Sequence, residues 1–385
     1  MRGKQLVAFA AAVVGIASAE AGDAPPPADP YAAALAHARA IEQQLVTTVD
    51  AVCDTCVSVL NDQIPPDPPP KKGVTTPPAK KEPVTMFIGS GTIVRTGTGG
   101  QTKLWILTNH HVVDGAVKIE VITRDGVKRP VEIVDEVKEF DISLLRFTGK
   151  TDGLKSVAVR GKASVELDEG QWCFATGNPF GLAMDGKPVV TLGVVSGKDR
   201  VLGGSLLYGR AIQHDAAVNH GNSGGALWNV KGEYLGINGK IITNSNGLAS
   251  GQQAANVGAS FSIPVEEIDA FLTRLTDPKK DARAGYLGVL AETDTDKDGK
   301  ACGARITVID PRSPAFGPKG LRAFDVIVSV SVPRPDGQKS FPVKTHSELI
   351  NVLSLCPAGT RITVTFHRGG RGESLYWSGE LGIPQ

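Results

Sequence analysis

The chain has 385 residues, 41% of them hydrophobic, so it is long enough for two or three domains with apolar cores. Its 41 Lys and Arg residues nearly balance 40 Asp and Glu residues, and a net charge of +1 gives no reason to expect nucleic acid as a partner. With 45 glycines and only 5% aromatic residues, the composition is typical of strands and turns rather than helices.

Residues 1–19 have the pattern of an export signal. Arg2 and Lys4 precede an apolar stretch over residues 6–17, and Ala17-Ser-Ala19 forms a small-x-small cleavage site. A membrane anchor is the alternative, but the stretch is shorter than the roughly 20 residues that span a bilayer. We therefore expect a mature chain without a membrane span that acts in the periplasm or outside the cell.

Residues 20–62 are predicted to form an N-terminal helical segment. Within them, Tyr31–Asp62 lacks Gly and Pro and repeats apolar residues every three or four positions, which indicates one helical stripe. Prolines are concentrated immediately afterwards, so residues 63–84 are predicted to be an extended linker. A plain spacer is favoured over a docking motif for this linker.

The cysteine count is odd, which leaves at least one thiol unpaired in an oxidising compartment. Cys173 lies in a run typical of a buried strand and is the expected unpaired residue. Cys53 and Cys56 form either a local disulfide or two free thiols. A bridge between Cys302 and Cys356 is a further pairing that the sequence leaves open.

From Thr85 the sequence changes to short β-rich runs separated by glycine. This pattern predicts an all-β domain over residues 85–276, built as barrels or a pair of sheets. A helix is expected to close the domain, because Pro264 suits a first helical turn and Val265 begins an apolar face. The strands are expected at residues 86–94, 103–108, 117–123, 171–176, 189–195 and 234–238.

A second linker is expected at residues 277–283, followed by a small, mostly β domain over residues 284–385 with one helix near residues 346–353. Within this domain, Asp294-Thr-Asp-Lys-Asp-Gly299 imitates the start of a calcium loop, but Arg305 stands where the loop needs a bidentate Glu. An acidic turn is therefore favoured over a metal site. No cofactor is expected for the chain.

Gly221-Asn-Ser-Gly-Gly225 places a serine hydroxyl on a turn of small residues. Such a turn lets a substrate carbonyl approach closely and points the N–H groups of Gly221 and Ser223 at one developing oxyanion. Upstream, Thr108-Asn-His-His-Val-Val113 supplies a histidine, and Asp141 leads into an apolar strand. The order His, Asp, Ser is that of chymotrypsin-type enzymes and not of subtilisins or α/β-hydrolases.

A serine hydroxyl is a poor nucleophile at neutral pH unless a base accepts its proton. Ser223 is therefore the predicted nucleophile, and His111 is predicted to take its proton and return it to the leaving amine. Asp141 would fix the imidazole tautomer and stabilise the imidazolium.

Six segments together resemble the HtrA/Deg family of serine proteases, and the chain resembles members of this family that carry one C-terminal PDZ domain. They cover roughly residues 85–275, and as a set they are specific. The matching segments are residues 89–94, 108–114, 141–145, 177–181, 193–197 and 215–225. In this family's motif the catalytic histidine directly precedes Val-Val, which selects His111 over His110.

The resemblance implies a mainly β fold, with a chymotrypsin-like pair of six-stranded β-barrels followed by the PDZ domain. It also implies ATP-independent cleavage of unfolded or damaged proteins by a homo-trimer or larger assembly. Val218 and Ile241 would line an S1 pocket for small aliphatic side chains. Residues 177–182 and 238–246 match loops that regulate the oxyanion hole.

The C-terminal domain resembles a PDZ module that binds peptide C-termini. Tyr286-Leu287-Gly288-Val289 matches the loop whose backbone N–H groups bind the terminal carboxylate. Leu349 and Leu353 lie four residues apart on the expected helix and would line the groove. Phe324 stands where members of the family usually have Gly, which puts the turn geometry there in question.

Two other functions compete with an active, exported serine endopeptidase. The first is a catalytically idle binding protein or chaperone on a protease fold, although such relatives usually lose a triad residue or the glycines. The second is an esterase-like hydrolase, which no Gly-x-Ser-x-Gly elbow supports. The intact set of residues favours the peptidase.

Overall fold

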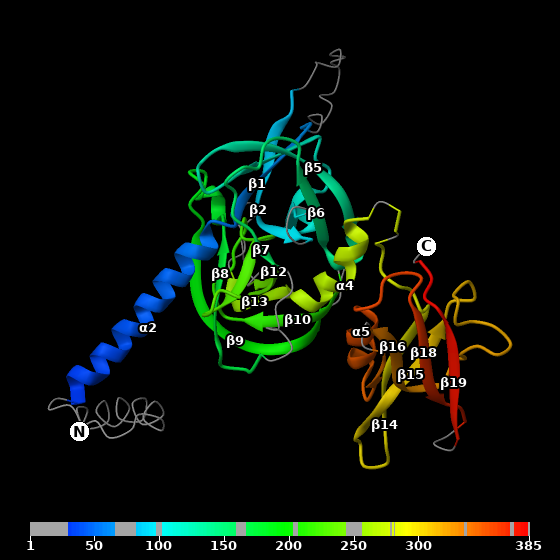
Figure 1. Ribbon diagram of the computed structural model, residues 1–385. Coiled ribbons are helices and arrows are strands. Elements are labelled where there is room, and N and C mark those ends of the chain that lie inside the picture. The colour runs from blue at the N-terminus through cyan, green and yellow to red at the C-terminus, as the bar shows by residue number, and fades with distance from the viewer. Residues whose placement is uncertain are drawn as a thin grey trace, which may run out of the picture. The chain divides into compact units, whose positions relative to one another are not determined.

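The computed structural model describes residues 30–65, 82–97, 102–158, 167–202, 207–243, 256–277, 279–280, 282–334, 337–369 and 373–383. The predicted signal peptide and most of the predicted Pro-rich linker lie outside these ranges. In the described part of the chain, no helix is long and apolar enough to cross a membrane. The chain divides into two units, residues 1–52 and 53–385 (Figure 1). The first unit contains most of helix α2 (Pro30–Cys53).

The second unit begins with a barrel of six antiparallel strands. The strand order is β1-β4-β5-β6-β3-β2, pairing of β1 with β2 closes the barrel, and β7 lies parallel to β2 at the rim. The strands are β1 (Cys56–Gln63), β2 (Val84–Thr96), β3 (Lys103–Thr108), β4 (Lys118–Ile122), β5 (Lys128–Val137), β6 (Ile142–Phe147) and β7 (Val157–Ala158).

A second closed barrel follows, with strand order β10-β13-β12-β11-β8-β9. Helix α4 (Val265–Leu275) ends it, with Pro264 as N-cap and with Ile268, Phe271 and Leu275 buried. The strands are β8 (Trp172–Gly177), β9 (Val189–Leu202), β10 (Tyr208–His214), β11 (Ala226–Asn229), β12 (Tyr234–Thr243) and β13 (Asn256–Pro264). The predicted pair of six-stranded barrels and the closing helix are confirmed.

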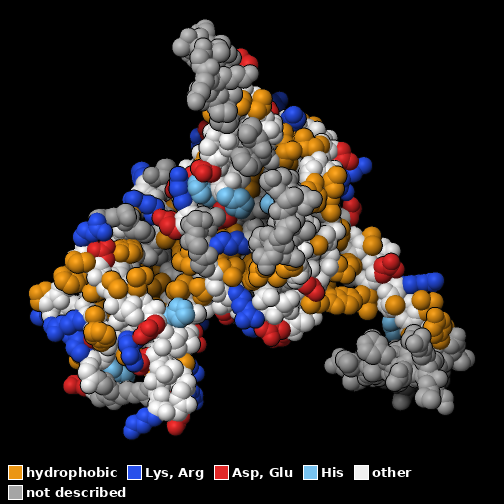
Figure 2. Space-filling model, turned by 180° about the vertical axis from the view of Figure 1, so that it is seen from behind, with side chains coloured by type: hydrophobic (Ala, Val, Ile, Leu, Met, Phe, Trp, Pro, Cys, Tyr) orange, Lys and Arg blue, Asp and Glu red, His pale blue; other side chains and the backbone are white. Residues whose placement is uncertain are grey.

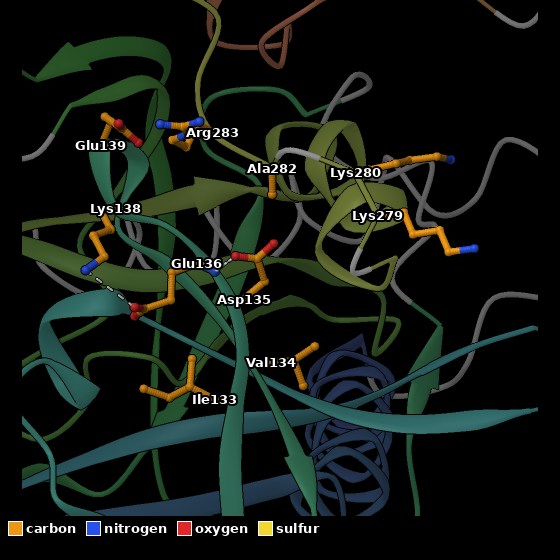
Figure 3. A pocket seen from close by; sticks show the side chains of 10 residues that line it. All are labelled: Ile133, Val134, Asp135, Glu136, Lys138, Glu139, Lys279, Lys280, Ala282 and Arg283. Carbon is orange, nitrogen blue, oxygen red and sulfur yellow. Dashed lines mark hydrogen bonds and ion pairs between the residues drawn. The ribbon is translucent and has the colours of Figure 1, made fainter. Parts of the chain in front are cut away.

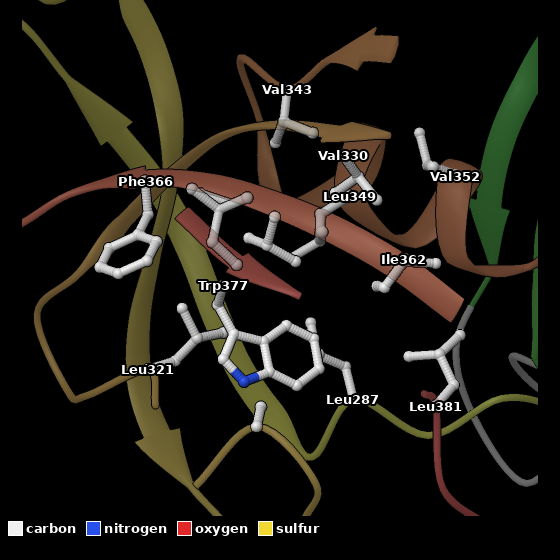
Figure 4. Packing of buried hydrophobic residues seen from close by; sticks show 14 of the residues in the cluster. Leu287, Leu321, Val330, Val343, Leu349, Val352, Ile362, Phe366, Trp377 and Leu381 are labelled. Atoms are coloured by element: carbon white, nitrogen blue, oxygen red, sulfur yellow. The ribbon is translucent and has the colours of Figure 1, made fainter. Parts of the chain in front are cut away.

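The C-terminal residues form a separate sheet with one helix. Its order is β14-β15-β16-β18-β19, and β17 pairs with β16. The elements are β14 (Val289–Thr295), β15 (Ala301–Ile309), β16 (Val326–Arg334), β17 (Gly337–Pro342), α5 (His346–Leu353), β18 (Arg361–His367) and β19 (Ser374–Glu380). Alternate residues of β18 are buried, and Figure 4 shows Trp377 between Leu287 and Leu321 in the core that they face.

The prediction of one helix continuing to Asp62 is wrong. Helix α2 ends at Cys53, and residues 56–63 form strand β1, whose first six residues are all buried. A run that is buried on both faces has no alternation, so its sequence pattern does not separate strand from helix. The first barrel therefore starts at Cys56 and not at Thr85.

The calcium-like segment is a turn without a metal geometry. Asp296 accepts hydrogen bonds from the backbone N–H groups of Asp298 and Lys300, and the Asp294 carboxylate is paired with Arg305. Among the described residues, no group of three or more His, Cys, Asp or Glu could hold a metal ion.

Deleting β1 should destroy the first barrel, whereas deleting the helix should not. Val57, Val59 and Leu60 of β1 are buried, and each such side chain stabilises the fold by about 2 kcal/mol. Their sum of about 6 kcal/mol is comparable with the whole stability of a domain. We expect calorimetry to show cooperative unfolding of the first barrel in a variant lacking residues 20–52. In a variant lacking residues 20–63, the unfolding transition of this barrel should be absent. Equal behaviour of the two variants would contradict this role of β1.

Replacing Phe324 by glycine should stabilise the C-terminal domain. Phe324 has a φ of +70°, in the left-handed region that favours glycine, and its side chain is 76% exposed. A left-handed conformation costs a non-glycine residue roughly 1 kcal/mol, and little packing is lost with this side chain. We expect Phe324→Gly to raise the free energy of unfolding by about 1 kcal/mol in urea titrations. The control Phe324→Ala keeps the unfavourable φ and should show no such gain.

Candidate active site

The predicted catalytic histidine lies on a short helix at the end of β3. Helix α3 (His110–Val113) begins directly after Asn109, whose amide Nδ2 donates to the Asp141 carbonyl at 3.0 Å. Val112 packs into the core of the first barrel. The helix is therefore fixed on its inner side, while the His111 side chain stays 41% exposed on the outer side.

Asp141 is a buried carboxylate held by three donor groups. It follows the turn η3 (Lys138–Phe140) in a left-handed conformation, with φ 60° and ψ 38°, which aspartate tolerates better than most residues. Oδ1 accepts from the His111 backbone N–H at 3.0 Å, and the His111 ring Nδ1 lies 2.8 Å from Oδ2. The Tyr208 hydroxyl donates to Oδ2 at 2.8 Å. Because no part of Asp141 is exposed, these donors replace water around the charge.

The Ser223 turn requires glycine at two of its positions. Gly221 and Gly224 have φ values of +98° and +85°, which only glycine adopts without strain. A Cβ at Gly221 would lie 2.2 Å from the Asn178 carbonyl oxygen, and a Cβ at Gly224 would lie 2.1 Å from the Ser90 carbonyl oxygen. A larger residue at either position would move the serine away from its supports.

Ser90, on β2, joins segments of the site that come from both barrels. Its N–H donates to the Ser223 carbonyl at 2.8 Å, and its own carbonyl accepts from the Thr108 hydroxyl at 2.7 Å. Its hydroxyl donates to the Gly221 carbonyl at 2.6 Å and accepts from the Asn178 N–H at 2.7 Å. One residue thereby fixes the serine turn relative to the end of β3, from which α3 starts.

The serine turn and the histidine helix lie on either side of one glycine. A Cβ placed on Gly89 would lie 2.5 Å from Val112 and 3.3 Å from the Ser223 carbonyl oxygen. Ser223 Oγ itself donates to the Gly239 carbonyl at 3.3 Å. Figure 2 shows histidine side chains gathered on one face of the molecule, beside acidic and basic side chains.

The two residues predicted to line the S1 pocket belong to one apolar cluster of the second barrel. Val218 is 1% exposed, and Ile241 packs against the same cluster while staying partly exposed. Of the two predicted regulatory loops, residues 177–182 contain the turn η4 (Pro179–Gly181), and residues 238–246 are described only as far as Thr243.

Two other histidines near the site, His110 and His214, have partners outside the predicted triad. His110 Nδ1 lies 2.7 Å from Glu136 Oε1, which also accepts from the Ser143 hydroxyl at 2.7 Å. His214 is fully buried, with its Nε2 3.0 Å from the Ser262 hydroxyl. Burial lowers the pKa of His214 to about 4, although the Asp215 carboxylate acts in the opposite direction.

Glu136, the partner of His110, also lines a hollow of about 650 Å³ (Figure 3). Glu136 and Lys138 line it together, with Lys138 Nζ 3.8 Å from Glu136 Oε2, and Arg283 contributes a further cation. Its lining carries both signs of charge, which does not select one class of ligand. The predicted triad residues do not line it.

The residues predicted to bind peptides in the C-terminal domain lie at the start of β14 and on α5. Gly288 has a φ of +79°, and a Cβ there would lie 2.0 Å from the Ser313 Cβ, so the loop requires glycine. Leu287 and Leu349 are almost fully buried in the domain core, and Leu353 packs against that core while partly exposed. Leu353 is therefore the better placed of the two helix residues to contact a ligand.

None of the five cysteines, all of them in the described part of the chain, forms a disulfide. Cys173, the predicted unpaired residue, is fully buried, and burial raises its pKa to about 12. Cys56 donates to the Thr176 hydroxyl at 3.2 Å, and burial, with a smaller effect of Cys53, raises its pKa to about 12 as well. Of the pairings left open by the sequence, neither a Cys53–Cys56 nor a Cys302–Cys356 disulfide is therefore formed.

The sequence did not point to Tyr208, Gly239 or the role of Ser90. Ser90 lies within one of the matching segments, so it was recognisable as part of a motif but not as a hydrogen-bonding centre. Tyr208 belongs to no catalytic pattern, and Gly239 lies in a segment matched to a regulatory loop without being singled out there. Their contacts with Asp141 and Ser223 arise only when the strands of the second barrel are assembled.

Residues 89–237 match the family model of the trypsin-like peptidase domain. The chain is 33% identical over 295 residues to a probable periplasmic serine protease do/HhoA-like of Haemophilus influenzae, covering 75% of this chain and 57% of that protein. It is 31% identical over 292 residues to the periplasmic serine endoprotease DegP of Escherichia coli, covering 74% and 55%. The chain thus spans about half the length of the curated relatives it matches.

The fold is also similar to that of solved HtrA-type proteases. The structure of AlgW with a decapeptide has a TM-score of 0.64 and 24% sequence identity, and the match covers 89% of this chain and 99% of that one. The serine endoprotease from Yersinia pestis has a TM-score of 0.55 and 23% identity, covering 88% and 98%.

The buried His214 should make stability fall in mild acid. Its pKa is lowered from 6.5 to about 4 in the folded state, so it stays neutral when folded while the unfolded chain takes up a proton. Above pH 6.5, His214 does not lower the free energy of unfolding. Below pH 6.5 the loss caused by protonation of the unfolded chain grows until the pH reaches about 4. We expect His214→Gln to reduce the stability difference between pH 7.5 and pH 5 by about 2 kcal/mol in urea titrations. An unchanged difference would contradict a neutral His214.

Proposed function

Because the chain belongs to the HtrA family of trypsin-like serine proteases, we propose that it is an exported serine endopeptidase. It would hydrolyse peptide bonds of unfolded or damaged proteins without ATP. One observation carries the proposal: Ser90 ties the Ser223 turn to the segment that leads into the His111–Asp141 pair. The relatives named periplasmic support action in the periplasm.

The chemistry follows from the three side chains. Ser223 Oγ turns from the Gly239 carbonyl to His111 Nε2, gives it the proton and attacks the carbonyl carbon of the substrate. The C–N bond then breaks while His111 donates that proton to the leaving amine, and an acyl-serine remains. Water, deprotonated by His111, then attacks the acyl carbon. The bond from that carbon to Ser223 Oγ breaks while His111 returns the proton to Oγ, which releases the carboxylic product and the free serine. Asp141 holds the imidazole in the tautomer that these transfers need.

The N–H groups of Gly221 and Ser223 would stabilise the oxyanion of each tetrahedral intermediate. The tie between the Gly221 carbonyl and the Ser90 hydroxyl supports this role, since it fixes the peptide plane beside Gly221. Val218 and Ile241 would form an S1 pocket without charge, which favours Val, Ala or Ile before the cleaved bond.

The C-terminal domain would bind peptide C-termini as a PDZ module. The loop Tyr286–Val289 precedes the edge strand β14, and an extended peptide would add to that edge with its carboxylate at the loop. The protease domain would run from Cys56 to Thr276, a short linker from residue 277 to 283, and the PDZ domain from residue 284 to 385. A homo-trimer is the assembly that we propose.

Replacing Ser223 by alanine should abolish proteolysis. We expect the purified mature chain to cut unfolded β-casein after Val, Ala or Ile, as read from the new termini by mass spectrometry. Ser223→Ala should lower turnover by about four to six orders of magnitude, because the nucleophile is lost. Equal cutting by both proteins would point to a contaminating protease. No cutting by the wild type, with suppressed aggregation of a test protein, would favour a binding protein on the protease fold.

A further inference from the structure

Tyr208 is a buried tyrosine that the triad scheme leaves unassigned. It opens β10, and its ring is among the largest fully buried side chains of the protein. Its hydroxyl donates to Asp141 Oδ2 at 2.8 Å, whereas the His111 backbone N–H donates to Oδ1 at 3.0 Å. The His111 ring nitrogen faces both oxygens, at 3.0 and 2.8 Å. Each carboxylate oxygen therefore has its own fixed donor in addition to the ring.

Two separate donors prevent the carboxylate from rotating. Without Tyr208, the only donor to the Asp141 carboxylate besides the His111 ring would be the His111 backbone N–H at Oδ1, and the carboxylate could turn about its Cβ–Cγ bond together with the ring. The His111 ring would then lose its fixed orientation. A buried carboxylate with one donor fewer also has a less stabilised charge, because no water reaches it.

The backbone places Tyr208 where it is needed. The N–H of the preceding residue, Leu207, donates to the Glu139 carbonyl at 2.8 Å. Glu139 belongs to the turn η3, which presents Asp141. The start of β10 and the aspartate turn are thus joined by a backbone bond as well as by the side-chain bond, so the phenol and the carboxylate move together.

Gly239, on strand β12, leaves a space that fits the phenol oxygen. A Cβ on Gly239 would lie 1.8 Å from the Tyr208 hydroxyl oxygen, so any other residue at this position would displace that hydroxyl. The next residue, Lys240, places its Nζ 4.7 Å from the centre of the Tyr208 ring. An ammonium over an aromatic face attracts the ring and holds it in place.

We propose that Tyr208 is a positioning residue of the catalytic triad, held by Gly239 and Lys240, that fixes the Asp141 carboxylate for His111. This inference rests on the proposed peptidase function. Tyr208 acts as donor throughout the working range, because burial, and then the Asp141 charge, raise its pKa well above the usual value. The charged groups around it are Asp141, Lys240 and, beyond the ring, Glu267.

The test compares Tyr208→Phe with Tyr234→Phe. Tyr234 is also a buried tyrosine of the second barrel, but it packs against Trp228 and makes no contact with Asp141 that the structure records. Both changes remove one buried hydroxyl, so effects of burial alone appear in both variants. Folding of each is checked by circular dichroism and thermal unfolding.

We expect Tyr208→Phe to lower kcat on a peptide substrate about tenfold, with KM changed less than about twofold, because a hydrogen bond to a charged group is lost. The acid limb of the pH profile of kcat/KM should move to higher pH, since a less stabilised Asp141 charge favours the imidazolium. Tyr234→Phe should leave both quantities unchanged. A folded Tyr208→Phe protein with wild-type kcat and acid limb would overturn the proposal.

A second readout does not depend on activity. The proton between His111 Nδ1 and Asp141 gives a downfield NMR resonance, which should shift or broaden in Tyr208→Phe and stay in place in Tyr234→Phe. If the wild type cuts nothing, the peptidase function fails, while an unchanged resonance in Tyr208→Phe would overturn the positioning role by itself. If Tyr208→Phe does not fold, Lys240→Met removes the cation over the ring and, with it, the attraction of that cation to Asp141. Lys240→Met should then change kcat, the acid limb and the NMR resonance in the same direction as expected for Tyr208→Phe, but by a smaller amount. The absence of all these changes would overturn the proposal.

Discussion

The site depends on one fully hydrogen-bonded residue, Ser90, at the meeting point of the two barrels. Its N–H, carbonyl and hydroxyl contact the serine turn, the end of β3 and the loop after β8. Buried polar groups are costly unless they are paired, so this arrangement permits few other positions of the three segments. The approach of Ser223 to the His111 helix follows from that constraint.

Around this centre, the cost of burying charge decides which side chains are possible. Asp141 is completely buried, and the His111 backbone, the His111 ring and Tyr208 together replace its water. His214 lies in the same strand as Tyr208 but finds less compensation, so it stays neutral. The cost of burying charge is thus offset by hydrogen-bond donors at Asp141, whereas His214 avoids that cost by staying neutral.

Where the sequence misled, the cause was burial on both faces. The run from Cys56 to Asn61 is continuously buried, since β1 lies between β2 and β4 in a closed barrel. Its apolar residues therefore show no strand-like alternation. Their spacing happens to extend the apolar repeat of helix α2, so the sequence pattern suggested one longer helix. By contrast, α4 and α5 have one exposed face each, and the sequence predicted the start of α4 at Val265 and the range of α5 at residues 346–353, as observed.

The sequence by itself determined the fold class, the order of His111, Asp141 and Ser223, and the glycines of the serine turn, because these depend on local conformation and on short motifs. Only the tertiary structure decided that β1 belongs to the first barrel, that Ser90 joins the site and that Tyr208 and Gly239 meet beside Asp141. Those contacts link residues more than thirty positions apart, from Tyr208 to Asp141 and to Gly239, and from Ser90 to Ser223. They exist only once closure of both barrels fixes strand register, which no local pattern encodes.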